Sequence, residues 1–299
     1  MQLNKGAIVQ VVDFYNRASY KAIQIPQLVP TDGFTVIQGV EDKVASPNGW
    51  NSDGTTTYTT TQGNNVDVSI GSYRPDAGSS LVFDSNWDAT AAPNSDANKK
   101  TSATHLFYLI NRMHDISYQY GFTEAAGNFQ QKNYAKGGKE GDRVKANDQS
   151  SQGMNNANFA TPPDGQAGVM NMYLFDITNP HRDGTLDSII PIHEFTHGIS
   201  NRLTGGSRNG QCLQSSESGG MGEGWSDTLA VYLGQTATNT RAGNFPMGYY
   251  VLGQASNGAG IRRYPYSTDL KTNPLTYSAF KKSSEVHNVG EIWASNCKF

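Results

Sequence analysis

The chain has 299 residues, of which 36% are hydrophobic, and its formal net charge is −3 at pH 7. This length is enough for one large domain or two closely packed lobes, and the weak charge indicates neither a nucleic-acid nor a membrane partner. No run of about eighteen apolar residues occurs, so we predict no transmembrane helix. The only cysteines, Cys212 and Cys297, exclude a disulfide framework but leave one bridge between them open.

The first half of the chain is predicted to consist mainly of short strands and loops. Residues 55–73 place β-branched and aromatic residues around a Gly-Asn-Asn sequence, which favours a β-hairpin. The segments LVFD (81–84) and VMNMYLFDI (169–177) are typical of further strands. Between them, residues 101–122 are predicted to form a long helix that ends at Gly121. Its apolar residues recur at helical spacing: Leu106, Leu109, Ile110 and Met113.

From residue 187 onward the hydrophobic pattern becomes helical. One helix is predicted to begin at an N-cap formed by Asp187 or Ser188 and to end before Gly205. Two further helices are predicted over residues 223–234 and 286–294.

These elements together predict an α+β fold with two lobes. Residues 18–186 would form a β-rich N-terminal lobe with one long helix, and residues 187–299 a helical C-terminal lobe. Residues 1–17 are assigned to neither lobe.

The segment PIHEFTHGISNR, residues 191–202, carries two histidines and a glutamate within five positions. Because each helical residue turns by about 100°, His193 and His197 would lie on one face, one turn apart, with Glu194 about a quarter turn away. Zinc binds neutral imidazole nitrogens, and a catalytic zinc site has three protein ligands and a water. The pattern His-Glu-x-x-His on a helix is typical of metallopeptidases. The alternative interpretation is a chance pattern of two surface histidines.

The third metal ligand must come from another part of the chain. The extended pattern with a third histidine six residues after the second fails, because Leu203 stands at that place. A glutamate on a following helix is the other option, and the candidates are Glu217 and Glu223. Glu223 is favoured because Asp227 follows it by one helical turn and could accept the second ring proton of a metal-bound histidine. Glu217, in a predicted loop, stays the rival.

Several segments resemble the fungalysin family of secreted zinc metalloendopeptidases, which are relatives of the thermolysin-like enzymes. The segments are HEFTHGISNRLTGG, ESGGMGEGWSD, ASPNGWNSDGTTTYTTTQGNNV, RMHDISYQYGFTEAAGNFQ, NNANFATPPDGQ, IRRYPYSTD and VHNVGEIWA, and they cover roughly residues 45–294. The resemblance implies a thermolysin-like fold with the active site between the lobes and one Zn²⁺ held by His193, His197 and Glu223. Glu194 would act as general base and acid, taking a proton from the attacking water and passing it to the leaving amine.

The same resemblance implies a cellular context. The enzyme would be secreted to the extracellular space, made as a zymogen inhibited by its own propeptide, and active on protein or peptide substrates. Calcium is an additional cofactor that the sequence leaves open.

Further site residues follow from the resemblance. His287 would stabilise the tetrahedral oxyanion opposite the metal. Arg262 would bind a substrate backbone carbonyl, and Asn156 and Ala157 would belong to an edge strand that pairs with an extended peptide. The position nine residues before the glutamate ligand, often a tyrosine in the related enzymes, is Gln214 here.

Two features depart from the family pattern. Residues 1–17 resemble only the tail of a propeptide, and ASYKA (18–22) resembles the start of a mature enzyme. The chain stops at Phe299, directly after the GEIWA segment, where the family continues with further helices. The alternative function is therefore a truncated, non-catalytic homologue that binds zinc or peptide without turnover.

Overall fold

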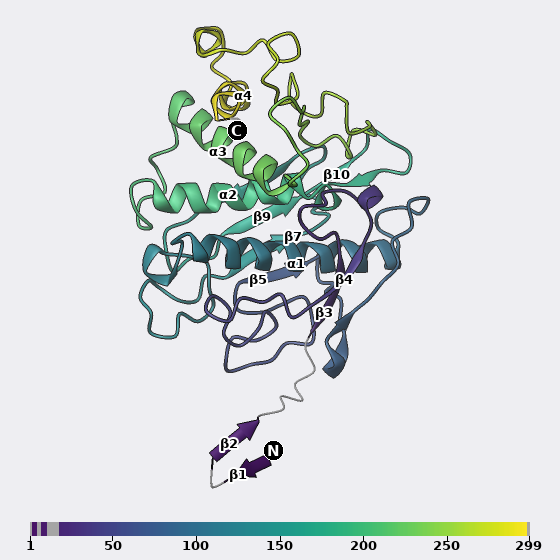
Figure 1. The fold of residues 1–299 in the computed structure, drawn as a ribbon, viewed down its shortest axis with the longest axis vertical. Helices are drawn as coiled ribbons and strands as arrows, with labels where there is room; N and C mark the ends of the chain where they lie inside the picture. The colour runs from purple at the N-terminus through teal and green to yellow at the C-terminus, as the bar shows by residue number, and fades with distance from the viewer. Residues whose placement is uncertain (1, 5–6, 11–17, 298–299) are drawn as a thin grey trace.

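The computed structural model describes residues 2–4, 7–10 and 18–297, and it has a mixed α+β fold (Figure 1). Within these residues the strands are β1 Gln2–Asn4, β2 Ala7–Gln10, β3 Ser19–Ala22, β4 Thr35–Gln38, β5 Val66–Ser69, β6 Val82–Phe83, β7 Val144–Asn147, β8 Ala157–Ala160, β9 Val169–Met172, β10 Leu174–Phe175 and β11 Arg182–Asp183. The α-helices are α1 Asp96–Gln119, α2 Ile189–Leu203, α3 Ser216–Leu233 and α4 Val286–Asn296. Short 3-10 helices are η1 Pro30–Asp32, η2 Gly78–Ser80, η3 Glu124–Ala126, η4 Gly184–Leu186 and η5 Tyr277–Lys282.

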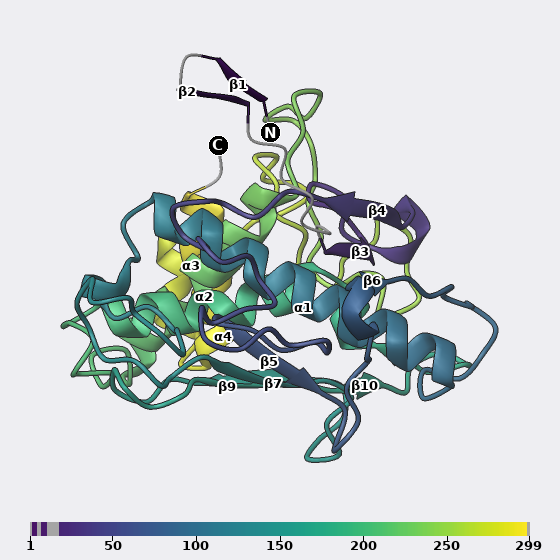
Figure 2. The ribbon, with the colours of Figure 1, turned by 90° about the horizontal axis from the view of Figure 1, so that it is seen from below.

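A four-stranded sheet lies against the two central helices. Its order is β5-β7-β9-β8, in which β5, β7 and β9 are parallel and β8 is antiparallel at one edge. Helix α1 contacts β5 and α2, while α2 contacts β8, β9 and α3. Figure 2 shows the strands running alongside α1. Helix α2 is therefore held between the sheet and α3, with the edge strand β8 beside it.

A second, three-stranded sheet of order β4-β3-β6 also contacts α1, through β3. The buried Tyr20 ring of β3 packs against Trp50, Phe83 and Phe107, with ring centroids 5.4, 5.6 and 5.8 Å away. Its hydroxyl donates a hydrogen bond to the side chain of Asn51. This aromatic cluster joins the sheet to α1 in the core.

Helix α1 begins at Asp96, five residues before the predicted start at residue 101. Ser95 is its N-cap, and the Ser95 hydroxyl accepts a hydrogen bond from the Asn98 amide at 3.4 Å. The backbone turns left-handed at Gly121, with φ of +101°, where the predicted stop stood. Most residues of α1 are buried on every side, because sheets and α2 surround the helix.

His105 of α1 helps to fix the beginning of α2. Its Nδ1 accepts the Ile23 amide at 3.4 Å, so its proton is on Nε2, which lies 3.1 Å from the hydroxyl of Ser188. Burial lowers the pKa of His105 to about 3 and keeps the ring neutral. Ser188 is the N-cap of α2, one of the two residues predicted for that position, although its side chain makes no capping hydrogen bond.

The predicted hairpin over residues 55–73 is only partly formed. The turn exists, because Gln62 bridges Asp67 in an antiparallel pair, but only Val66–Ser69 forms a strand, and it pairs in parallel with β7. The first arm is not a strand because the side-chain amide of Asn51 donates to the carbonyls of Thr60 and Gln62. These carbonyls therefore find partners outside a strand ladder.

The long segment between α3 and α4, residues 234–285, contains turns and only one short helix, η5. Two bridges organise it: Phe245 pairs with Tyr266 in an antiparallel bridge, and Met247 pairs with Gly260 in a parallel one. This segment returns the chain to the α2–α3 region before α4 begins.

Three sequence predictions concern features away from the core. The candidate propeptide remnant, residues 1–17, lies partly outside the described residues, and within it β1 and β2 form an antiparallel pair. Cys212 and Cys297 both carry free thiols. Of the helices in the described part of the chain, none is long and apolar enough to cross a membrane.

Asp187 links the start of α2 to the segment between α3 and α4. Its Oδ2 accepts the amides of Tyr250 and Val251 at 3.0 and 3.4 Å, and the side chain is fully buried. Burial raises the pKa of Asp187 from 3.8 to about 7, although these hydrogen bonds oppose the rise.

We expect Asp187→Asn to change how stability depends on pH. The folded wild type holds this proton to a higher pH than the unfolded chain, so its free energy of unfolding should fall as pH rises from about 4 to about 7. Relative to the variant, which cannot titrate here, the loss should be about 1.4 kcal/mol per pH unit. Chemical unfolding of both proteins across this range measures it, and a constant difference would contradict the prediction.

Candidate metal centre

Two histidines of α2 face the same space one helical turn apart. The Nε2 atoms of His193 and His197 are 3.0 Å apart, and the rings are nearly perpendicular at 85°. On the other sides of the helix, Ile192 and Phe195 are buried in the core. The hydrophobic face of α2 thus fixes the direction in which the histidines point.

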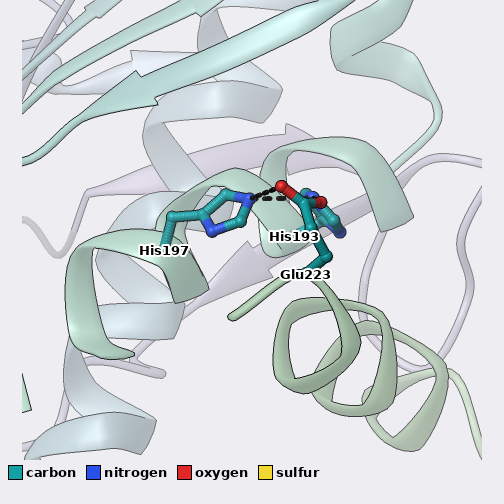
Figure 3. Close-up of side chains that lie close together, drawn as sticks. All are labelled: His193, His197 and Glu223. Carbon is teal, nitrogen blue, oxygen red and sulfur yellow. Dashed lines mark hydrogen bonds and ion pairs between the residues drawn. The ribbon is translucent and has the colours of Figure 1, made fainter. Parts of the chain in front are cut away.

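Glu223 reaches the two histidines from α3 (Figure 3). Its Oε2 lies 3.2 Å from His193 Nε2, and its Oε1 lies 3.5 Å from His197 Nε2. Of the described residues, His193, His197 and Glu223 form a cluster whose ligand atoms all lie within 4.8 Å of one another. The rival Glu217 lies in the first turn of α3, is exposed and does not belong to this cluster.

Helix α3 begins at Ser216, seven residues before the start predicted at residue 223. The glycines at the beginning of α3 argue against a helix in the sequence, because each glycine lowers the stability of a helix interior by about 1 kcal/mol relative to alanine. Here the glycines allow close packing against α4. A Cβ at Gly220 would lie 2.1 Å from Val289 Cγ1, and one at Gly224 would lie 2.7 Å from the Trp293 ring.

The side chain of Asp227, one turn after Glu223, sets the protonation of His193. Its Oδ1 lies 2.7 Å from His193 Nδ1 and accepts that ring proton, so the lone pair available for a metal is on Nε2. Arg262 donates to the same carboxylate from Nε and Nη2, each at 2.8 Å. These charges lower the pKa of Asp227 even though burial acts to raise it.

The donor set fits a tetrahedral zinc ion. Zinc bonds of about 2.0–2.1 Å require ligand atoms about 3.3 Å apart. The two nitrogens are 3.0 Å apart, and the Glu223 carboxylate lies 3.2 Å from His193 through Oε2 and 3.5 Å from His197 through Oε1. Glu223 Oε2 is buried and has no hydrogen-bond partner among the described residues. Two imidazole nitrogens and the Glu223 carboxylate therefore converge where a cation would satisfy all three groups.

Charge balance gives the same indication. Burial acts to lower the pKa of His193, but the hydrogen bond to Asp227 and the ion pair with Glu223 raise it to about 10. Burial acts to raise the pKa of Glu223, yet the histidines lower it to about 2. The two carboxylates therefore hold a positive charge between them, and a metal ion binding at His193 would displace a proton.

Glu194 lies beside this cluster, and its pKa is shifted in the opposite direction from that of Glu223. Burial raises its pKa to about 7; the charge of His193 opposes the rise and that of Glu223 adds to it. A carboxyl group with such a pKa can both accept and release a proton near neutral pH.

A cleft of about 330 Å³ opens next to His193 and Glu194, and the other residues predicted for the site line it: Asn156, Ala157, Arg262 and His287. His287, at the start of α4, has Nε2 3.5 Å from Glu223 Oε2 and Nδ1 2.6 Å from Glu285. Gln214 lines a neighbouring pocket together with His197 and Glu223.

Three residues of this region were not predicted from the sequence. Glu285 contacts His287, Tyr266 donates its hydroxyl proton to Asp227, and Gly290 lies against Glu223. None of them stands at a motif spacing that indicates a site. The glycine content of residues 219–224 was the one available signal, because it indicates close backbone approach as well as helix breaking.

A His-Glu-x-x-His helix with a glutamate on the next helix is typical of zinc metallopeptidases. The fungalysin metallopeptidase (M36) family model matches residues 19–297, and the chain belongs to this family. It is 45% identical over 304 residues to the extracellular metalloproteinase MEP of Pyricularia oryzae. This alignment covers 98% of the chain and 47% of that relative. It is also 46% identical over 294 residues to extracellular metalloproteinase 3 of Trichophyton soudanense. That alignment covers 95% of the chain and 74% of the relative. The chain spans about half the length of the first of these relatives.

We expect Gly290→Ala to weaken metal binding. A Cβ at Gly290 would lie 2.5 Å from Glu223 Cβ, so α4 must move or Glu223 must turn away from the histidines. Zinc affinity, measured by competition with a chelator, should fall at least about tenfold. Gly222→Ala is the matched control, because its Cβ would meet Leu213 at an ordinary 3.4 Å. Equal affinities in both variants would show that the close contact does not position Glu223.

Proposed function

We propose that this chain is a zinc-dependent endopeptidase that hydrolyses peptide bonds of extracellular proteins. The observation that carries the proposal is the convergence of His193, His197 and Glu223 beside the buried Glu194. Membership of the fungalysin family supports it.

In this proposal His193, His197 and Glu223 hold one zinc ion. Zinc supplies a Lewis acid that lowers the pKa of a water to about 7 and polarises a carbonyl. Asp227 fixes His193 in the tautomer with its proton on Nδ1, which turns the Nε2 lone pair toward the ion.

Glu194 carries the proton. With a pKa near 7, its carboxylate takes a proton from the attacking water and then gives it to the departing amine. Its near-complete burial excludes bulk water from this transfer, which strengthens the electrostatic effect of neighbouring charges.

His287 is proposed as the donor that stabilises the oxyanion. Glu285 contacts its Nδ1 at 2.6 Å, which directs Nε2 toward the Glu223 side of the cleft. Such a donor stabilises charge that develops only in the transition state.

An extended peptide substrate is proposed to pair with β8. This strand is hydrogen-bonded to β9 on one side only, and its first residue, Ala157, lines the cleft together with the preceding Asn156. Unpaired backbone groups at a sheet edge can bind a peptide strand. Arg262 uses Nε and Nη2 on Asp227, so the substrate carbonyl proposed for it would be bound by Nη1.

The cellular context is part of the proposal. The relatives are named extracellular metalloproteinases, which supports secretion. We propose a thermolysin-like arrangement of two lobes, residues 18–186 and 187–299, with residues 1–17 as a remnant of an inhibitory propeptide.

We expect Glu194→Gln to keep zinc and lose cleavage. The amide preserves shape but cannot carry the proton, so hydrolysis of casein should fall by roughly 10²–10⁴-fold. Bound zinc, measured by elemental analysis, should stay at one ion per chain. A variant that cuts as fast as the wild type would refute the assigned role. A wild type that binds zinc but leaves casein uncut would favour the non-catalytic alternative.

We expect His287→Ala to slow turnover without loss of metal. Loss of one oxyanion donor costs about 10²–10³ in kcat. Because His287 is not in the ligand cluster, zinc affinity should stay close to that of the wild type. His181→Ala, at an exposed histidine directly before β11, is the control. Unchanged kcat in His287→Ala would remove this residue from the mechanism.

A further inference from the structure

The Asp227 carboxylate accepts hydrogen bonds from three side chains. Oδ1 receives His193 Nδ1 at 2.7 Å and Arg262 Nη2 at 2.8 Å. Oδ2 receives Arg262 Nε at 2.8 Å and the hydroxyl of Tyr266. Each carboxylate oxygen therefore has two donors, and this set fixes the rotation of the carboxylate plane.

Tyr266 is held rigidly where it makes this contact. The side chain is 3% exposed, so its hydroxyl is shielded from bulk water. Its backbone forms an antiparallel bridge with Phe245, with both N–H···O distances at 2.9 Å. The preceding turn is anchored as well, because Arg263 donates to the buried Glu291 of α4 from its amide and from Nε, at 2.8 and 2.7 Å. The hydroxyl is thus presented to Asp227 from a fixed backbone.

We propose that Tyr266 is a positioning residue for the metal centre, acting through Asp227 on the orientation of His193. The inference rests on the proposed function, since it assumes that His193 is a zinc ligand. Tyr266 contacts Asp227, and Asp227 contacts His193, so Tyr266 itself would touch neither metal nor substrate.

Arg262 and Tyr266 bind the Asp227 carboxylate in different ways, and this difference supports the positioning role of Tyr266. Arg262 binds the carboxylate through both oxygens and places its positive charge beside Asp227. Tyr266 is a neutral donor to Oδ2 alone, so its contribution is directional. Without it, Oδ2 would keep one donor, and the carboxylate could rotate together with the arginine. His193 follows any such rotation because its Nδ1 proton is bound to Oδ1.

The test is zinc affinity in Tyr266→Phe, measured by chelator competition on the full chain. The substitution removes one hydroxyl and keeps the ring, and groups that orient a metal ligand typically contribute tenfold or more to affinity. We expect an affinity loss of about tenfold and a changed visible absorption spectrum when Co²⁺ replaces zinc.

Tyr20→Phe is the matched control. Tyr20 is also a buried tyrosine whose hydroxyl donates to a side-chain carbonyl, that of Asn51, but its contacts are in the β3 sheet. Both variants should lower the stability of the metal-free protein, and only Tyr266→Phe should lower zinc affinity. Equal affinity losses in the two variants would overturn the proposal, since the effect would then be a general loss of stability.

A double-mutant cycle with Asp227→Asn tests the route of the effect. If Tyr266 acts through Asp227, Tyr266→Phe should change zinc affinity much less in the Asp227→Asn background than in the wild type. Equal changes in both backgrounds would overturn the inference. Unchanged zinc affinity in Tyr266→Phe alone would overturn it too, while leaving the proposed function intact. A wild type that binds no zinc would overturn both.

Discussion

The positive charge that Glu223 and Asp227 require between them governs the arrangement of the site. Both acids belong to α3, one turn apart, and both approach His193 of α2. Two carboxylates can be buried this closely only if cationic groups compensate them, because an unpaired buried charge costs several kcal/mol. Arg262 supplies one such group, and a protonated imidazole or a bound metal ion supplies the other. The packing of α2 against α3 therefore depends on the same charge as the chemistry.

The parts of the site that lie on one helix could be predicted from the sequence. Helical geometry alone puts His193 and His197 on one face, and the structure has them with their Nε2 atoms 3.0 Å apart. The spacing of four residues between Glu223 and Asp227 likewise puts both on one face of α3. Contacts between distant segments could not be predicted in this way. Tyr266 follows Asp227 by 39 positions, and no periodicity connects them.

The error at α3 has a physical cause. Single-residue propensity counts each glycine against a helix, whereas here Gly220 and Gly224 let α4 approach closely enough to bury Val289 and Ile292. Tertiary packing therefore outweighs local preference. The misread hairpin has a similar origin, since the side-chain amide of Asn51 satisfies backbone carbonyls that a strand partner was expected to bind.

The close approach of Gly290 to Glu223 connects α4 with the candidate metal cluster. The backbone of α4 at Gly290 lies close to the Cβ of Glu223, and His287, in the first turn of the same helix, lines the cleft. A single displacement of α4 would therefore alter both the cleft and the carboxylate of the candidate metal cluster, so the two cannot be adjusted independently.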